Sequence, residues 1–240
     1  MPTRTKPKPP APAVDAAVLR VVPLFKGVDD RVLQDAIAAA RTRRVPAGGV
    51  FFRENDPATT IYLLVAGRVK ATQLTPEGHQ VIHMLLTSGE AFGGVSALGE
   101  GVYPVTAEAV EDSFALSWDA ATMTALMRAH PDIAINTARF VARRLHELQV
   151  QHRQLMTERV ERRVARALLK LARHAGRRVQ QGVQIDFPLS RQDLAEMTGT
   201  TLFTVSRLLS AWEEQGAIAT GRRKVTIREP HRLVEIAEEL

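Results

Sequence analysis

The stretch from residue 189 to residue 218 constrains the fold of this chain most, because it carries signals for two short helices. Ser190 can cap a helix through its side-chain oxygen, and Asp193 can bond back to the amide of that cap residue. Gly199 ends this first helix, since glycine readily adopts the positive φ of a tight turn. Thr201 can cap a second helix that stops at Gly216. The stretch therefore predicts two helices, over about residues 191–198 and 202–215, joined by a tight turn.

The two faces of the second predicted helix differ in chemistry. Apolar residues recur at helical spacing on one face, namely Val205, Leu208, Leu209 and Trp212. The other face carries side chains sized to reach base edges, namely Phe203, Ser206, Arg207 and Ser210. A helical hairpin buried in another core would usually expose charged residues instead. With the small Ala195 where the helices cross, these features predict a DNA-binding helix-turn-helix.

The composition is that of a soluble chain long enough for two domains. It has 240 residues, of which 45% are hydrophobic and 24% charged. The lack of cysteine excludes disulfides, thiolate zinc sites, iron–sulfur clusters and thiol catalysis. Apolar runs are too short to span a membrane, and the N-terminus lacks the apolar core of a signal peptide. We therefore expect a cytoplasmic protein with no membrane partner.

The net charge of +6 is unevenly placed along the chain. Residues 1–13 carry three basic and no acidic side chains, and residues 157–240 carry 15 basic and 11 acidic ones. The region between them carries 14 basic and 15 acidic side chains. The positive excess thus accompanies the predicted helix pair, where DNA phosphates would need neutralising.

Four segments follow from the pattern along the chain. Residues 1–13 are rich in proline and predict a disordered basic tail. Residues 14–118 begin with two short helices and continue in short β-type runs between turn signals, which indicates an antiparallel β-roll able to hold a small ligand. Residues 119–156 predict helices, and residues 157–240 predict a helix followed by the helix-turn-helix domain. The expected strands cover residues 50–52, 61–65, 69–74, 80–86, 106–110 and 183–187.

The predicted helix over residues 132–156 contains neither glycine nor proline. Its apolar residues are spaced alternately by three and four, which is the pattern of a coiled-coil seam. We expect its N-terminal end to pack on the β-roll and the rest to form a two-fold homodimer. The predicted dimer seam consists of Ala138, Val141, Leu145, Leu148, His152 and Leu155.

A basic hairpin is predicted after the helix-turn-helix. Residues 217–220 and 225–227 are β-type runs on either side of Gly221-Arg222-Arg223-Lys224. We call this hairpin the wing. Its basic tip is suited to contact with DNA phosphates.

Several motifs, together with the order of predicted elements, indicate relatives of the chain. They are Leu24-Phe25, Ile61-Tyr62-Leu63-Leu64, Gly67-Arg68-Val69-Lys70, Thr75-Pro76-Glu77-Gly78, Gly89-Glu90-Ala91-Phe92-Gly93 and residues 190–216. Together they resemble the Crp/Fnr family of bacterial transcription regulators. The resemblance implies an α+β fold with an N-terminal antiparallel β-roll, a long dimerisation helix and a C-terminal winged helix-turn-helix. It also implies a homodimer on a pseudo-palindromic site in double-stranded DNA, contact with RNA polymerase, and effector binding in the roll.

The implied effector pocket departs from that of the cyclic-nucleotide members. Those members hold ribose with a glutamate and the cyclic phosphate with an arginine–serine pair, where this chain has Gly94 and Pro104-Val105. A phosphate site without its arginine loses charge-assisted hydrogen bonds, so we do not expect cyclic AMP. Residues 200–207 resemble the nitrogen-oxide-responsive branch, which makes haem a possible cofactor and His83 its candidate ligand. The expected pocket comprises His83, Gly93, Gly94, Val95, Ser96, Pro104 and Val105.

Family members commonly read DNA with a glutamate, a serine and an arginine on the second helix. Here Ser206 and Arg207 match that pattern, while Phe203 replaces the glutamate and offers apolar contact, for example to a thymine methyl. We expect Arg207 to bind guanine in a bidentate manner. The expected DNA-binding residues are Ser190, Arg191, Gln192, Thr200, Thr201, Phe203, Thr204, Ser206, Arg207, Arg222, Arg223 and Lys224.

Alternative functions stay open. A metal-dependent β-roll enzyme with an accessory DNA-binding domain needs several histidines and a carboxylate around one ion, and the nearest candidates are His79, His83 and Glu90. A regulator of the same fold that needs no ligand is another alternative. A structural adaptor would leave the outer face of the second helix unexplained. We predict a regulator and no enzyme, with no metal site and no catalytic residues.

Overall fold

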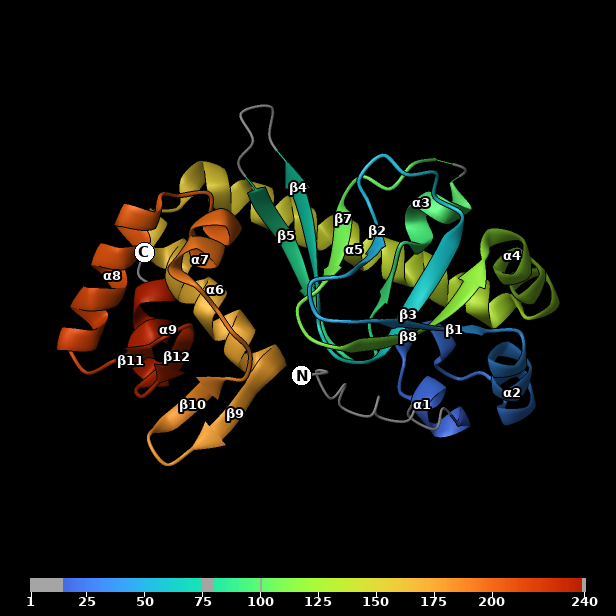
Figure 1. The fold of residues 1–240 in the computed structure, drawn as a ribbon, viewed down its shortest axis with the longest axis horizontal. Coiled ribbons are helices and arrows are strands. Elements are labelled where there is room, and N and C mark those ends of the chain that lie inside the picture. The colour runs from blue at the N-terminus through green and yellow to red at the C-terminus, as the bar shows by residue number, and fades with distance from the viewer. Residues whose placement is uncertain (1–14, 75–79, 100, 239–240) are drawn as a thin grey trace, which may run out of the picture. The chain divides into compact units, whose positions relative to one another are not determined.

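The computed structural model describes residues 15–74, 80–99 and 101–238 (Figure 1). The proline-rich tail and the turn at Thr75-Pro76-Glu77-Gly78 lie outside these residues. The chain divides into two compact units. Of the described residues, the first comprises those between 15 and 70 and between 86 and 141, and the second comprises those between 71 and 85 and between 142 and 238.

Short helices begin the first unit and follow its strands. Asp15 caps the first of them by accepting the amides of Ala17 and Val18. Asp119 caps a later helix through the amide of Thr122, at 2.7 Å. The helices are α1 (Ala16–Arg20), the 3-10 helix η1 (Pro23–Phe25), α2 (Asp30–Ala38), α3 (Gly94–Leu98), α4 (Ala120–Ala129) and the start of α5 (Pro131–Thr157).

Two antiparallel sheets form the roll, as the sequence predicted. One has the order β1 (Arg41–Val45), β8 (Ser113–Asp119), β3 (Thr60–Ala66) and β6 (Ala91–Phe92). The other has the order β2 (Val50–Phe52), β7 (Thr106–Ala109), β4 (Val69–Leu74) and β5 (Gln80–Leu86).

Three strands of the roll were not predicted, namely β1, β6 and β8. The central strand β8 is buried at every position except its last, so it lacks the polar alternation that marks a half-exposed strand. The edge strand β1 has the opposite character, because three of its five residues are arginines. Charged side chains are common on edge strands, since they discourage pairing with another sheet.

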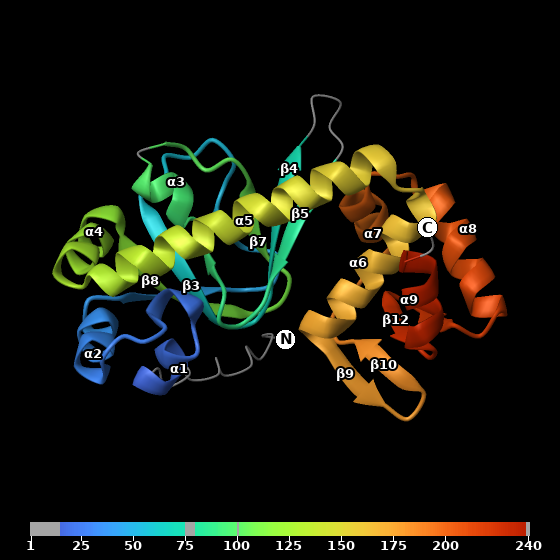
Figure 2. The same cartoon turned by 180° about the vertical axis from the view of Figure 1, so that it is seen from behind.

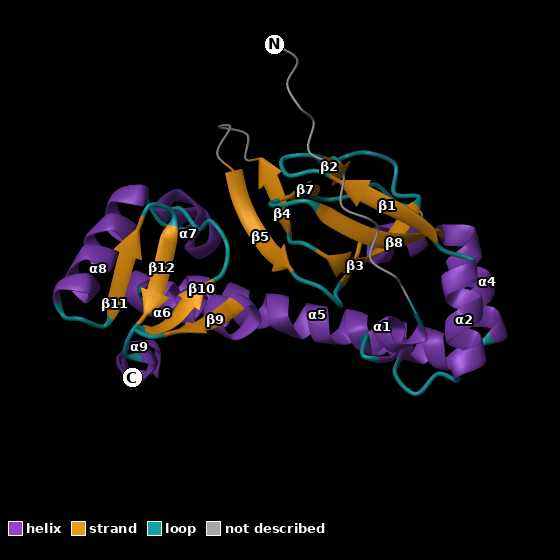
Figure 3. Ribbon diagram, turned by 60° about the horizontal axis from the view of Figure 1, so that its bottom comes forward, coloured by secondary structure: helices purple, strands orange, loops and turns teal. Residues whose placement is uncertain are grey.

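The second unit contains the helix-turn-helix and a four-stranded sheet of order β11-β12-β10-β9 (Figure 3). Its core includes Leu168, Leu194, Val205, Leu209 and Trp212, all at most 1% exposed. The expected strand at 183–187 is shorter and ends at Ile185. The elements are α6 (Val160–Ala175), β9 (Gly176–Val179), β10 (Gly182–Ile185), α7 (Arg191–Thr198), α8 (Leu202–Glu214), β11 (Ile218–Gly221), β12 (Lys224–Ile227) and α9 (Pro230–Glu238).

The helix α5 runs without interruption for 27 residues (Figure 2). Its N-terminal end is held in the first unit by Ile133, which is fully buried, and by Asn136. The Nδ2 of Asn136 donates to the carbonyl oxygens of Leu24 at 3.2 Å and Lys26 at 2.8 Å. Further along, the six predicted seam residues are all exposed in the single chain. No helix in the described part of the chain combines the length and apolarity needed to cross a membrane.

Candidate nucleic-acid interface

The turn between α7 and α8 is built from the local signals that the sequence predicted. Ser190 Oγ accepts the amide of Asp193 at 3.0 Å, and Asp193 Oδ2 accepts the amide of Ser190 at 2.7 Å, which forms a capping box. Gly199 has φ of 60°, in the left-handed region. Thr201 Oγ1 accepts the amide of Thr204 at 3.2 Å and caps α8. The caps therefore set where each helix begins, and the left-handed conformation of Gly199 ends α7 and turns the chain toward α8.

The inner and outer faces of α8 are divided as expected. Val205, Leu209 and Trp212 are buried, and Leu208 is partly buried against the same core. On the outer face, Phe203 is 78% exposed and Arg207 is also exposed. Ser206 and Ser210 are half-buried at its margin.

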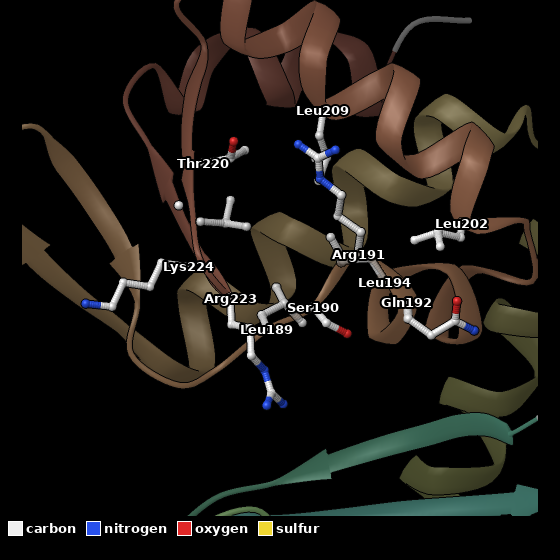
Figure 4. A pocket seen from close by; sticks show the side chains of 12 residues that line it. Leu189, Ser190, Arg191, Gln192, Leu194, Leu202, Leu209, Thr220, Arg223 and Lys224 are labelled. Carbon is white, nitrogen blue, oxygen red and sulfur yellow. The ribbon is translucent and has the colours of Figure 1, made fainter.

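Helices α7 and α8 and the wing surround a shallow hollow of about 310 Å³ (Figure 4). Arg191 and Gln192 line it from the first turn of α7, Leu202 from the start of α8, and Arg223 and Lys224 from the wing, with the charged ends of Arg223 and Lys224 directed outward. The first amides of a helix have no partners within it and attract anions. The surface around the hollow thus combines a helix N-terminus with three cationic residues, which suits contact with DNA phosphates.

Two of the expected DNA-binding side chains also bond within α7. The hydroxyl of Ser190 donates to Asp193 Oδ2 at 2.7 Å, so its proton is already used. Gln192 Nε2 donates to Glu196 Oε1 at 3.0 Å. The side chains of both residues are therefore already hydrogen-bonded, and a phosphate at this end of α7 would be bound through the backbone amide of Gln192.

The wing is a tight hairpin in which Gly221 pairs with Lys224, so that Arg222 and Arg223 form its tip. All three basic side chains are exposed. Arg223 has φ of 56°, a backbone conformation that residues other than glycine seldom adopt. Its carbonyl oxygen accepts the amide of Leu189 at 2.9 Å, which ties the wing tip to the approach of α7.

One residue of this surface was missed by the sequence reasoning. Leu202, which was assigned to neither face of the second helix, is 48% exposed and borders the hollow. The sequence could have identified Leu202 from its position directly after the cap residue Thr201. In a helix-turn-helix, the first turn of the second helix faces the DNA.

The expected effector pocket is an ordered part of the roll. Gly93, with φ of 74°, caps α3, which contains Gly94, Val95 and Ser96. A side chain at Gly93 would meet Tyr103 Cε1 at 3.2 Å and Phe52 Cε1 at 3.3 Å. Pro104, which is exposed, and Val105 follow in the chain. The space beside Gly93 is therefore occupied by aromatic rings.

Those rings belong to a buried aromatic cluster. Tyr103 stacks on Phe52 with ring centroids 3.7 Å apart, and its hydroxyl donates to the carbonyl oxygen of Thr60 at 2.7 Å. Burial raises the pKa of Tyr103, so the phenol stays a neutral donor. The members of the cluster are Phe51, Phe52, Tyr62, Phe92 and Tyr103.

His83 does not lie among these residues. It is exposed on β5, and its Nε2 is 3.0 Å from Oε1 of Gln73. This setting does not fit a haem site, which needs an imidazole nitrogen directed into an apolar slot. His79 lies outside the described residues, and within the described ones no three histidine, aspartate or glutamate side chains gather as a metal site.

Comparison with known proteins agrees with this architecture. The family model described as a Crp-like helix-turn-helix domain matches residues 162–236, and that described as a cyclic nucleotide-binding domain matches residues 42–130. The cyclic AMP receptor protein of Thermus thermophilus is 36% identical over 90% of this chain and 96% of its own length. The fumarate and nitrate reduction regulatory protein of Escherichia coli is 24% identical over 82% of this chain and 78% of its own.

A solved structure gives the same result for the fold. FixK2 from Bradyrhizobium japonicum matches with a TM-score of 0.73 and 25% identity, over 84% of this chain and 98% of that one. The predicted fold class is thus confirmed. The chain belongs to the Crp/Fnr family of DNA-binding transcription regulators.

Proposed function

We propose that this chain regulates transcription by binding a pseudo-palindromic site on double-stranded DNA as a homodimer, and that it has no enzymatic activity. The observation that carries the proposal is the surface around α8. An exposed arginine on that helix, the N-terminus of α7 and the basic wing lie on one unit. In such an arrangement phosphate contacts fix the register, and Arg207 reads a base edge.

The exposed side chains of α5 support the dimer. Leu145 and Leu148 are each 57% exposed, Leu155 is 44% exposed and Val141 is 38% exposed. Apolar residues at this spacing on an otherwise polar helix are stabilised by packing against a second copy of the same helix. A two-fold dimer would place the two α8 helices about 34 Å apart, on successive turns of the major groove.

The input to the roll is a separate part of the proposal. Cyclic AMP is not the effector, because Pro104 and Val105 replace the expected arginine and serine. The input would be a signal other than cyclic AMP, and ligand-independent action is the alternative; the rings of Phe52 and Tyr103 beside Gly93 support that alternative. Contact with RNA polymerase is part of the proposal as the step that follows DNA binding.

Two measurements test this function. Selection of bound sequences from random oligonucleotides should yield a symmetric site, and sedimentation should show a dimer at micromolar concentration. A monomer with no preference for symmetric sites would refute the proposal. For the input, titration with haemin should give no Soret band that shifts with nitric oxide, and cyclic AMP should leave DNA affinity unchanged. A ligand-sensitive Soret band would restore the haem hypothesis.

A further inference from the structure

The first turn of α8 presents an apolar surface within the proposed DNA interface. It consists of Leu202, 48% exposed, and Phe203, 78% exposed, and we call it the apolar tip. Isolated exposed apolar side chains are common on proteins, so exposure alone identifies nothing. Leu202, however, borders the same hollow as Arg191, Arg223 and Lys224 (Figure 4). Leu202, one of the two residues of the apolar tip, therefore lines the same hollow as three residues that could contact the DNA backbone.

The polar groups of the same turn are directed at one another. Thr201 Oγ1 and Thr204 Oγ1 are 2.9 Å apart, and Thr201 Oγ1 also accepts the amide of Thr204. One of the two hydroxyl protons is thus used within the turn. The large outward side chains of this turn are a leucine and a phenylalanine, and the nearest long donor on the outer face is Arg207, one turn later.

The major groove has one apolar feature, the methyl group at C5 of thymine. A phenyl ring cannot hydrogen-bond to the polar edge of a base. Burying such an edge against the ring would leave its donors and acceptors without partners. We infer that the apolar tip recognises a C5-methylated pyrimidine, and that this contact sets the sequence preference of the half-site beside the base read by Arg207. The inference rests on the proposed function, because it assigns a base contact within that interface.

The inference predicts how DNA affinity depends on the C5 substituent of one base. The methyl group itself, and not the pairing of the base, should determine affinity at that position. Deoxyuridine should therefore weaken binding, and 5-methylcytosine should bind better than cytosine there. Burial of one methyl group corresponds to about a fourfold change in affinity.

The experiment uses the full chain and the site obtained by selection. Each thymine of the half-site is replaced in turn by deoxyuridine, which removes the methyl and keeps every hydrogen-bonding atom. At one or two positions per half-site the dissociation constant should rise about three- to tenfold. If uracil changes nothing at any position, the inference is wrong while the proposed function stands. A selection that yields no symmetric site refutes the proposed function, and this inference with it.

Variants then assign the contact. Phe203→Ala should bind thymine and uracil sites equally, and Leu202→Ala should reduce the difference. Arg207→Ala is the matched control, since it should weaken binding to both sites while their ratio persists. Both tip residues are exposed, so the melting temperature should stay close to that of the parent chain. A uracil penalty that is unchanged in both tip variants would overturn the assignment.

Discussion

The guanidinium of Arg163 on α6 donates from Nε to the carbonyl oxygen of Thr198, 3.0 Å away, at the end of α7. The same group donates from Nη1 to the carbonyl oxygen of Glu158 at 2.7 Å and from Nη2 to that of Gly199 at 3.4 Å. The last carbonyls of a helix have no partners within it, and a cation there is favourable. The single side chain of Arg163 therefore connects the residue that follows α5 with the turn of the helix-turn-helix.

Replacing Arg163 should loosen the DNA-binding unit. Arg163→Leu leaves these carbonyls without their donor, which should lower the free energy of unfolding by about 1–3 kcal/mol. Arg163→Lys should recover only part of the loss, because an ammonium group lacks the planar fork. Urea titration of the parent and variants measures this, with Arg173→Leu, exposed on the same helix, as the control. Equal losses in Arg163→Leu and Arg173→Leu would contradict the role.

The helix-turn-helix was predictable because its determinants are local. Ser190, Asp193 and Thr201 accept amides within three residues of themselves, and Gly199 ends α7 by its left-handed conformation, as the structure shows. The strand β8 was missed for the opposite reason. It is placed by pairing with β1 and β3, which are distant in sequence, and its buried faces leave no alternation.

The effector region shows a second limit of sequence reasoning. Alignment along Gly93 identified which positions depart from the cyclic-nucleotide members. It did not reveal that Phe52 and Tyr103 stack beside Gly93, since these residues come from separate segments of the roll. Such non-local contacts appear only when the sheets are assembled.

The link between α8 and the wing should depend on pH. The hydroxyl and the amide of Thr220 both donate to Glu213, at 2.6 Å each, and hold the pKa of its carboxyl below the ordinary value of 4.5. A carboxyl with a lowered pKa in the folded state stabilises that state above its ordinary pKa, and the contribution disappears as the pH falls through the lowered value.

Thr220→Val should therefore be less stable than the parent at pH 7, by about 1 kcal/mol for the lost hydrogen bond. The difference should shrink as the pH falls below 4.5 and Glu213 becomes protonated. Thermal unfolding at a series of pH values provides the measurement, with Thr226→Val on β12 as the control. A difference that does not change between pH 7 and pH 3 would exclude this origin.

The dimer seam can be tested at its most exposed leucines. Leu145→Lys should weaken dimerisation by about 3 kcal/mol, roughly a hundredfold, because two leucine side chains lose their burial and two charges enter the interface. Sedimentation velocity at several concentrations measures the change. His146→Lys, exposed on another face of α5, should leave the dimer intact. A dimer that resists Leu145→Lys would show that the contact lies elsewhere.

Arg207 is expected to discriminate between bases. Arg207→Ala should cost about 1–3 kcal/mol on the selected site and much less on random DNA. Arg207→Lys keeps the charge but not the fork that matches guanine, so it should retain affinity for random DNA and lose specificity. Competition binding at fixed salt separates the two effects. An equal loss on both kinds of DNA would make Arg207 a phosphate contact instead.

At the wing tip, one substitution should change protein stability and DNA binding in opposite directions. Arg223 adopts φ of 56°, a conformation that costs other residues about 1 kcal/mol relative to glycine. Arg223→Gly should therefore raise the free energy of unfolding by up to about 1 kcal/mol.

The same substitution removes a cation from the proposed phosphate contact. The slope of log affinity against log salt should become shallower by about one per protomer. Arg222→Gly is the control, because Arg222 is not among the described residues with positive φ, so it should lose charge with no gain in stability. Binding measured over a range of sodium chloride, together with urea titration, tests both halves. If Arg223→Gly keeps the parent's salt dependence, the strained arginine has no part in binding DNA, because a side chain that holds a phosphate must release counterions when it does so.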